Sequence, residues 1–274
     1  MLAATLRRAR PFFLVAGPCV IESKEIVLEI AHSLKALGDD LDIPVVFKAS
    51  FDKANRQDIA SFRGPGLEEG LAILRDVKAE TGLPLLTDVH ETHQVDAVGK
   101  VVDIVQIPAY LCRQTDLLVA AANTGKLVNI KKGQMCSSET MLLAAKKVTT
   151  STGHNGVMRY SDVILTDRGT MFGYGDLVVD PRNIPKLQAQ GALVVQDITH
   201  SVQRTGASTT SGGDREFIPT IARMAAAVGV DGLFIETHPD PARGLSDSTT
   251  MLPLAELRPL LQELIAIAHA SNAR

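Results

Sequence analysis

The feature that most constrains the fold is a regular alternation of short apolar runs with helical patterns. Eight apolar runs are each followed by a stretch with apolar residues at helical spacing, and the connections between them are short. Such strict alternation is typical of a parallel sheet covered by helices. Eight strand–helix units within 274 residues favour a closed (β/α)8 barrel, a TIM barrel, over an open doubly wound sheet. No glycine-rich dinucleotide fingerprint opens a helix, which also disfavours the open sheet.

The predicted elements fill the chain from end to end. The strands are expected at residues 12–16, 44–47, 84–87, 103–105, 127–130, 162–166, 192–196 and 232–235. The helices are expected at 24–37, 67–81, 114–123, 137–148, 183–190, 216–228 and 254–270, with a short one from Glu91. Because no linker, sequence repeat or low-complexity segment interrupts this pattern, we predict one catalytic domain over residues 1–274.

The composition excludes several classes of partner. Hydrophobic residues make up 45% of the chain and charged residues 22%, which is ordinary for a globular protein. The formal net charge of −3 gives no general attraction to nucleic acid or to an anionic membrane. No apolar run reaches the ~20 residues that a membrane-spanning helix needs.

The N-terminus superficially looks like a signal peptide, because basic residues precede the apolar run 12–17. That run is too short, and Pro18 stands directly before Cys19, where a lipoprotein signal needs a small residue. We therefore interpret the run as the first strand. The three widely spaced cysteines argue against a disulfide framework and for a reducing compartment. We expect a cytoplasmic protein.

A chemically capable side chain lies at or near the end of each predicted strand. In chain order these residues are Cys19, Lys48, Asp88, Gln106, Lys131, Arg168, His200 and Glu236. Active sites of TIM barrels are built at the carboxyl ends of the strands. Polar side chains that point into a barrel mouth are costly unless they have partners or a ligand. The sequence therefore predicts that all eight belong to one site.

Five cations form one part of this predicted site, which we call the cationic set: Lys48, Lys53, Arg56, Lys131 and Arg168. Three of them lie within one stretch, residues 47–56, beside small residues that leave room for a ligand. Lys offers a mobile point charge and Arg a planar fork, and both suit phosphate or carboxylate. The alternative for this stretch alone is a solvated loop after a strand.

Four further residues form what we call the donor set: Cys19, His200, Glu236 and Asp247. A thiolate, an imidazole and carboxylates together suit a divalent transition metal such as Zn or Fe, with a position left open for substrate or water. Taken singly, a Cys after a strand is more often a small buried apolar side chain. The glycine-rich run Thr205–Gly213 is a candidate lid over the mouth, or a simple flexible loop.

Ten runs of the sequence carry a family resemblance. They are AGPCVIES (16–23), FKASFDKANR (47–56), FRGPGLE (62–68), LTDVHE (86–91), QIPA (106–109), RQTDL (113–117), NIKKGQ (129–134), TDRG (166–169), FGY (172–174) and FIETHP (234–239). On these runs the chain resembles, from end to end, the 3-deoxy-D-manno-octulosonate 8-phosphate synthases, also called 2-dehydro-3-deoxyphosphooctonate aldolases.

The resemblance implies a reaction and a set of binding residues. Phosphoenolpyruvate and D-arabinose 5-phosphate would condense to 3-deoxy-D-manno-octulosonate 8-phosphate and inorganic phosphate, on the route to lipopolysaccharide. Matching motifs imply that phosphoenolpyruvate binds the residues Lys48, Lys53, Gln106, Lys131 and Arg168. Asn55 and Arg56 would meet the sugar phosphate, Arg56 reaching across an interface of a homotetramer.

The resemblance also concerns the metal. The family has a metal-dependent branch with Cys at the position of Cys19 and a metal-independent branch with Asn. This chain looks like the former, with the donor set holding one divalent ion, Zn, Fe or Mn. The predicted catalytic residues are Lys131, Asp88, His200 and Cys19; Asp88, His200 and Glu236 are candidates for moving protons. Gln57 departs from the family pattern, where a small hydroxyl residue is expected, and residues 203–207 do not match it.

Two other functions are also compatible with the sequence. A 3-deoxy-D-arabino-heptulosonate 7-phosphate synthase would share the barrel, the phosphoenolpyruvate site and the metal set. It would carry Lys-Pro-Arg-Thr/Ser in place of Lys53-Ala54-Asn55-Arg56, so the Asn-Arg pair favours the arabinose enzyme. A non-catalytic barrel that only binds a sugar phosphate would bind without releasing phosphate.

Overall fold

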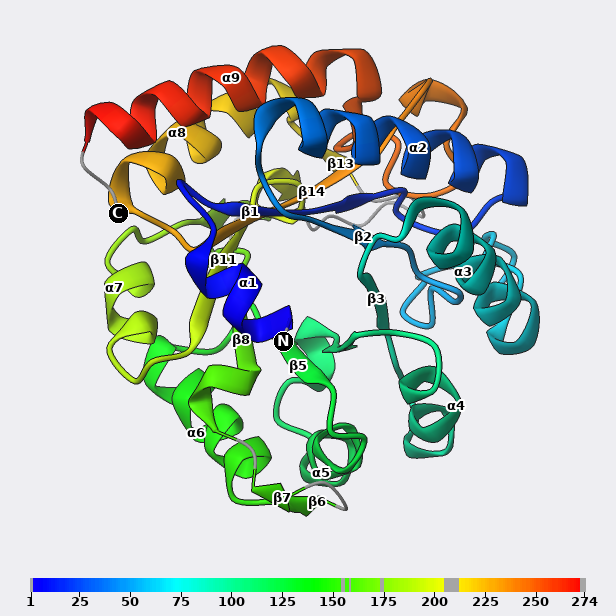
Figure 1. Cartoon of the computed structure of the whole chain (residues 1–274), viewed down its shortest axis with the longest axis vertical. Helices are drawn as coiled ribbons and strands as arrows, with labels where there is room; N and C mark the ends of the chain where they lie inside the picture. The colour runs from blue at the N-terminus through cyan, green and yellow to red at the C-terminus, as the bar shows by residue number, and fades with distance from the viewer. Residues whose placement is uncertain (1, 154–155, 158, 173–174, 205–211, 272–274) are drawn as a thin grey trace.

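The computed structural model describes residues 2–153, 156–157, 159–172, 175–204 and 212–271. Its centre is a closed barrel of eight parallel strands, ordered β1-β2-β3-β4-β5-β8-β11-β14, in which β14 pairs back with β1 (Figure 1). The strands are β1 (Phe13–Gly17), β2 (Val45–Lys48), β3 (Leu85–Asp88), β4 (Ile104–Ile107), β5 (Leu127–Lys131), β8 (Val163–Asp167), β11 (Leu193–Asp197) and β14 (Gly232–His238). The predicted TIM-barrel fold is confirmed.

Helices cover the outside of the barrel (Figure 1). They are α2 (Lys24–Leu41), α3 (Leu67–Thr81), α4 (Val95–Gly99), α5 (Thr115–Asn123), α6 (Ser138–Thr149), α7 (Asn183–Gln188), α8 (Ile218–Val228) and α9 (Leu254–Ala270). Local signals set their ends: the Ser23 side chain accepts a hydrogen bond from the backbone N–H of Ile26 at the start of α2, and Gly82 adopts a left-handed conformation after α3.

Two apolar clusters stabilise this arrangement. The larger lies between the sheet and the helices, where outward-facing strand residues such as Leu14 and Val128 meet helix residues such as Leu34. The smaller fills the barrel interior with alternate residues of the same strands, among them Phe13 and Phe234. The alternation of side chains along each strand therefore supplies both clusters.

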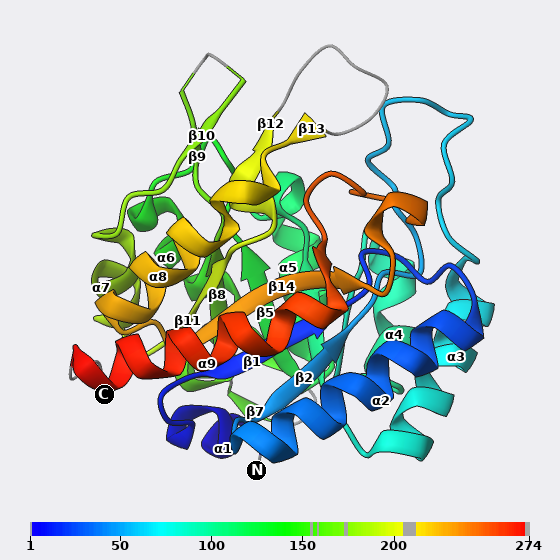
Figure 2. The same ribbon diagram turned by 90° about the horizontal axis from the view of Figure 1, so that it is seen from above.

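Residues 2–8 form a helix, α1 (Leu2–Arg8), that the sequence pattern did not predict. Leu6 is buried in the interior cluster with Phe13 and Phe234, so α1 closes the N-terminal end of the barrel. Figure 2 shows α1 at the end opposite the hairpins β9–β10 and β12–β13. Since one end is packed shut, the interior opens only at the carboxyl ends of the strands.

Several predicted boundaries need correction. All eight strands were predicted to end one or more residues too early, since the observed strands continue into polar residues such as Lys48, Asp88 and Lys131. The helix predicted at 216–228 begins at Ile218, after a 3-10 turn at Arg215–Phe217, and the one predicted at 183–190 ends at Gln188.

Short strands outside the barrel were also missed. Among the described residues, three antiparallel hairpins are β6 (Thr152–Gly153) with β7 (Gly156–Val157), β9 (Thr170–Met171) with β10 (Leu177–Val178), and β12 (Gln203–Arg204) with β13 (Gly212–Gly213). A two-residue strand β15 (Leu252–Pro253) extends β14. Residues 205–211 of the predicted lid lie outside the described residues, and Gly212–Gly213 pair in β13. A search of the described helices found none with the length and apolar character needed to span a membrane.

Candidate active site

The mouth of the barrel holds a cavity of about 530 Å³. Its walls contain nearly all of the residues predicted for the site: Lys48, Lys53, Asn55, Arg56, Asp88, Gln106, Lys131, Arg168, His200, Glu236 and Asp247. Cys19 is not in the wall but lies directly behind it, with its Sγ 2.8 Å from Oγ of Ser246. Seven of the eight strand-end residues thus line one cavity, and Cys19 lies behind its wall.

Three cations at the base of the cavity are almost inaccessible to solvent: Lys48, Lys131 and Arg168. Lys48 and Lys131 are the last residues of β2 and β5, and Arg168 directly follows β8. Nζ of Lys131 also lies 3.9 Å from the centre of the Phe234 ring, a cation–π contact from below. Burial lowers the pKa of Lys131 and of Arg168, although neighbouring carboxylates oppose the shift.

Close packing between β1 and β2 brings Lys48 next to the loop that carries Cys19. A Cβ on Gly17 would lie 2.0 Å from the carbonyl oxygen of Lys48, so only glycine fits there. Nζ of Lys48 donates to the carbonyl oxygen of Cys19 at 3.1 Å and to Oε1 of Glu236 at 3.2 Å. The cationic set and the donor set are therefore in direct contact.

The donor set converges on one point. One ligand atom from each of Cys19, Glu236 and Asp247 lies within 4.8 Å of the others, the only such group of three among the described residues. Nε2 of His200 lies 3.6 Å from Oε2 of Glu236 and 3.5 Å from Oδ2 of Asp247. The four predicted ligands thus come from four separate loops or strands to one place.

The chemistry of the donor set fits a divalent transition metal. Oε2 of Glu236 is buried without a hydrogen-bond partner, which is costly in the absence of a cation. Burial raises the pKa of the Cys19 thiol well above its ordinary value, and the charges of Asp247 and Glu236 raise it further. Thiolate, imidazole and carboxylate ligands together suit Zn, Fe or Mn.

Asp247 has a left-handed backbone conformation, with φ at +46°. Such a conformation is uncommon for a residue with a side chain and persists where the surroundings hold it. Here the backbone N–H groups of Thr250 and Met251 both donate to the Asp247 carbonyl oxygen, and the thiol of Cys19 donates to its carboxylate at 3.2 Å. The strained backbone therefore belongs to a residue that is also a predicted metal ligand.

A second polar group lies on the wall formed by β2 and β3. Oγ of Ser50 accepts a hydrogen bond from Nζ of Lys48 at 2.9 Å and donates to Oδ1 of Asp88 at 2.5 Å. Nε2 of His90 lies 3.0 Å from Oδ2 of Asp88. Burial alone would raise the pKa of the Asp88 carboxyl, but the hydrogen bond from His90 and the charge of Lys48 outweigh it and hold that pKa well below its ordinary value.

Two histidines near strand ends differ in position. His90 lines the cavity. His238 does not: its Nδ1 accepts from the backbone N–H of Asp240 at 3.0 Å, and its Nε2 lies 3.8 Å from Glu22 behind the site.

The loop after β2 brings Lys53, Asn55, Arg56 and Gln57 to the outer wall of the cavity. A guanidinium nitrogen of Arg56 donates to the carbonyl oxygen of Leu245 at 3.3 Å. Arg56 therefore lines the cavity of its own chain, and its expected role across an interface stays a prediction.

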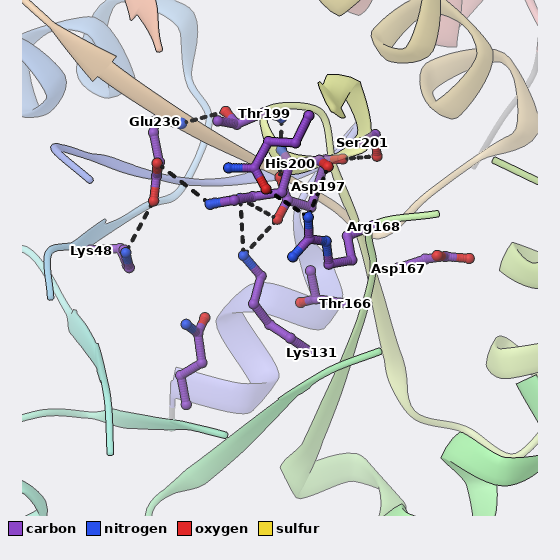
Figure 3. Close-up of polar contacts among 12 residues, drawn as sticks. Lys48, Lys131, Thr166, Asp167, Arg168, Asp197, Thr199, His200, Ser201 and Glu236 are labelled. Carbon is purple, nitrogen blue, oxygen red and sulfur yellow. Dashed lines mark hydrogen bonds and ion pairs between the residues drawn. The ribbon is translucent and has the colours of Figure 1, made fainter. Parts of the chain in front are cut away.

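Sequence reasoning missed Asp197, the last residue of β11. Its Oδ2 lies 2.5 Å from Nζ of Lys131 and 2.8 Å from Nδ1 of His200 (Figure 3). Burial would raise the pKa of this carboxyl, but the charges of His200 and Lys131 hold it well below its ordinary value. The three-residue spacing from Asp197 to His200 was a visible signal, because a carboxylate at that distance can reach a histidine on the same turn.

Comparison with known proteins agrees with this geometry. A model of a protein family, described as the DAHP synthetase I family, matches residues 8–270. The chain belongs to this family. Two relatives named "2-dehydro-3-deoxyphosphooctonate aldolase 2" and "2-dehydro-3-deoxyphosphooctonate aldolase 1", both from Arabidopsis thaliana, are 53% and 52% identical over 100% of this chain and 94% of their own length.

A bacterial relative extends the match. The protein named "2-dehydro-3-deoxyphosphooctonate aldolase" from Syntrophotalea carbinolica is 51% identical over 94% of this chain and 91% of its own length. The resemblance to the 2-dehydro-3-deoxyphosphooctonate aldolases is thereby confirmed over nearly the whole chain, inside the wider DAHP synthetase I family.

Proposed function

We propose that this protein condenses phosphoenolpyruvate with D-arabinose 5-phosphate and water, giving 3-deoxy-D-manno-octulosonate 8-phosphate and inorganic phosphate. The observation that carries the proposal is a single cavity in which the buried cationic set faces the donor set. Full-length relatives named as the octonate aldolase support the same reaction. Through this product the enzyme would serve lipopolysaccharide biosynthesis.

Phosphoenolpyruvate binds at the base of the cavity in this proposal. Its carboxylate and phosphate require several fixed positive charges, and Lys48, Lys131 and Arg168 supply them where water is largely excluded. Lys53 and Gln106 complete the site from the wall. Asn55 and Arg56, farther out, bind the phosphate of the sugar, so that the aldehyde lies over carbon 3 of phosphoenolpyruvate.

The donor set holds one divalent ion, Zn, Fe or Mn, through Cys19, His200, Glu236 and Asp247. When bound, such an ion supplies positive charge that polarises a carbonyl oxygen or orients and activates water. The contact between Lys48 and Glu236 supports this arrangement, because it fixes the carboxylate beside the cationic set at 3.2 Å.

The side chains of the cavity perform the remaining steps. Two anionic substrates repel one another in water, and the cationic set aligns them and converts their encounter into a unimolecular step. Carbon 3 of phosphoenolpyruvate then forms a bond to the aldehyde carbon, a water oxygen adds at carbon 2, and inorganic phosphate leaves. Asp88, His200 and Glu236 are the candidates for accepting and returning the protons that these steps move, and Asp88 is hydrogen-bonded to His90 outside the donor set.

We further propose that the chain acts in the cytoplasm as a homotetramer. Three free cysteines are compatible with a reducing compartment. The position of Arg56 in the cavity of its own chain favours a role there over the expected role across an interface.

An acceptor assay tests the reaction. The purified enzyme is given phosphoenolpyruvate with either arabinose 5-phosphate or erythrose 4-phosphate, and phosphate release is measured. We expect a higher kcat/KM with arabinose 5-phosphate. A preference for erythrose 4-phosphate would assign the heptulosonate 7-phosphate synthase activity instead, and binding without phosphate release would indicate a non-catalytic barrel.

Metal analysis tests the cofactor. We expect about one equivalent of a divalent transition metal in the purified protein, loss of activity with a chelator and recovery when the metal is returned. Full activity in a metal-free preparation would contradict the assignment of the donor set.

A further inference from the structure

Asp197 connects the two parts of the site without lining the cavity itself. It is completely buried at the end of β11. One oxygen, Oδ1, accepts the backbone N–H groups of Thr199 at 3.0 Å and of His200 at 2.8 Å. The other, Oδ2, faces Nδ1 of His200 at 2.8 Å and Nζ of Lys131 at 2.5 Å. All four neighbouring groups are hydrogen-bond donors or can be donors, so the Asp197 carboxylate can act as the acceptor in each of these contacts.

These contacts fix the orientation of the Asp197 carboxylate and, through it, of the His200 ring. The two backbone donors hold the plane of the carboxylate, and Oδ2 therefore has a set position. An ionised carboxylate only accepts hydrogen bonds, so the hydrogen of a neutral His200 belongs on Nδ1. Nε2 is then left as the lone-pair nitrogen, and it faces Glu236 and Asp247 at 3.6 and 3.5 Å. That is the orientation a metal ligand needs.

The same oxygen, Oδ2 of Asp197, also fixes the position of Lys131, a member of the cationic set. Nζ of Lys131 lies 3.2 Å from Nδ1 of His200, because both groups approach Oδ2 of Asp197 from the same side (Figure 3). A long lysine side chain has many rotamers, and this contact selects one of them beneath the cavity. The position of Lys131 and the orientation of His200 thus depend on one atom.

We propose that Asp197 is a positioning residue that couples the metal site to the phosphoenolpyruvate site. It orients Nε2 of His200 toward the donor set and holds the Lys131 ammonium beneath the substrate. The second half of this role rests on the proposed function, whereas the first half depends only on the donor set.

The chain offers a matched control in Asp167. This residue is also the buried last residue of a barrel strand, β8, and accepts a backbone N–H, from Gly169 at 2.8 Å. It too pairs with a lysine, Lys132, at 3.4 Å. Asn183, rather than a histidine of the donor set, supplies its other side-chain partner at 2.9 Å. Figure 3 shows Asp167 directed away from the cluster around His200.

The experiment compares Asp197→Asn with Asp167→Asn. Both variants are prepared metal-free, their folding is checked by circular dichroism, and the Kd for Zn²⁺ is measured by competition with a chromogenic chelator. We expect Asp197→Asn to raise the Kd by about 10- to 100-fold and Asp167→Asn to leave it at the wild-type value. An unchanged Kd in Asp197→Asn, or an equal rise in both variants, would overturn the proposal.

The second half is tested by calorimetric binding of phosphoenolpyruvate to metal-free protein. We expect Asp197→Asn to bind it about tenfold more weakly than the wild type, since Lys131 loses its fixed position. If Asp197→Asn binds phosphoenolpyruvate with wild-type affinity, the proposed coupling to Lys131 is wrong.

A measurement on the unaltered protein covers the case in which Asp197→Asn does not fold. In ¹⁵N-histidine-labelled, metal-free wild-type protein, the His200 signal is assigned by its absence from His200→Gln. The spectrum is recorded at a pH high enough to make the ring neutral; we expect that ring to carry its hydrogen on Nδ1, and a neutral ring with its hydrogen on Nε2 would overturn the proposal. Neither the metal Kd nor this spectrum depends on which sugar phosphate the enzyme accepts, so failure of the proposed reaction would be seen separately.

Discussion

At the scale of single residues, the site is a network of buried charges that depend on one another. Lys48, Lys131 and Asp197 have almost no exposed surface, and each contacts an opposite charge. Removing one partner leaves the other charge buried and uncompensated, which costs several kcal/mol, roughly 3–5. Variants in this network therefore need a stability measurement beside every activity measurement.

Lys131→Ala should lose activity by at least about 10²–10³-fold in kcat/KM, because it removes buried positive charge that no neighbour replaces. Steady-state phosphate release checks this, with Lys100→Ala as a control for net charge, since Lys100 is exposed. Loss of less than about tenfold in folded Lys131→Ala would contradict a role in binding phosphoenolpyruvate.

Cys19→Asn should retain some activity without metal, because the family resemblance implies a metal-independent branch with Asn at this position. The measurement is activity before and after exhaustive treatment with a chelator. The wild type should be inactivated and Cys19→Asn should be unaffected. Complete inactivation of the variant by the chelator would count against two branches that differ at this position.

Cys112 should be unreactive in the folded protein. Burial raises the pKa of its thiol to about 11, and Cys136, whose Sγ lies 3.8 Å away, adds to the shift. At pH 8 the thiolate fraction is then only about one in a thousand. Mass spectrometry after iodoacetamide treatment should show modification of Cys112 in urea and almost none in buffer. Equal rates in the two conditions would show that the site is open.

At the scale of the elements, the sequence predicted the eight strand–helix units and the residues at the strand ends, but not where the strands stop. The predictions ended with the apolar runs, whereas β2, β3 and β5 continue into Lys48, Asp88 and Lys131. Inside a barrel mouth these polar side chains find partners, so they remain in the strand although they interrupt the apolar pattern.

The missed elements have a different cause. The helix α1 is short and carries only one buried residue, Leu6. A single buried position gives no helical spacing of apolar residues, so the sequence pattern did not predict this helix. The hairpin β12–β13 consists of two paired residues on each side, too short for an alternation pattern. Asp197 was missed because the strand seemed to end at Gln196, and its partners come from another strand and from the turn that follows.

The helix α1 can be tested as a closure of the barrel. Leu6→Ala should lower the free energy of unfolding by about 2–5 kcal/mol, because Leu6 packs in the interior cluster. Leu143→Ala on α6 is the matched control, since Leu143 is 64% exposed, and it should change stability by less than about 0.5 kcal/mol. Urea titrations measure both. Equal effects would mean that α1 is not part of the core.

At the scale of the whole molecule, the barrel brings together side chains that lie far apart in the sequence. Cys19 and Asp247 are in contact although they lie 228 positions apart in the sequence. One end is closed by α1 and the other bears the cavity, so in the proposed function both substrates and the metal would share one entrance. The cavity is lined by residues of one chain, Arg56 and Lys131 among them.

Subunit mixing tests whether Arg56 serves its own chain. Inactive Arg56→Ala and Lys131→Ala chains are unfolded together and refolded, and activity is compared with that of each variant refolded alone. We expect no recovery, because Arg56 and Lys131 line the same cavity of one chain. Recovered activity in the mixture would show that Arg56 acts across an interface. Arg56→Ala mixed with wild type controls for refolding.

The most direct test of the account is a crystal structure of the protein with Mn²⁺ and phosphoenolpyruvate, with anomalous diffraction data that locate the metal. We predict one anomalous peak bounded by Cys19, His200 and Glu236 together with Asp247, and phosphoenolpyruvate density against Lys131 and Arg168. A metal bound elsewhere, or phosphoenolpyruvate away from these two cations, would contradict it.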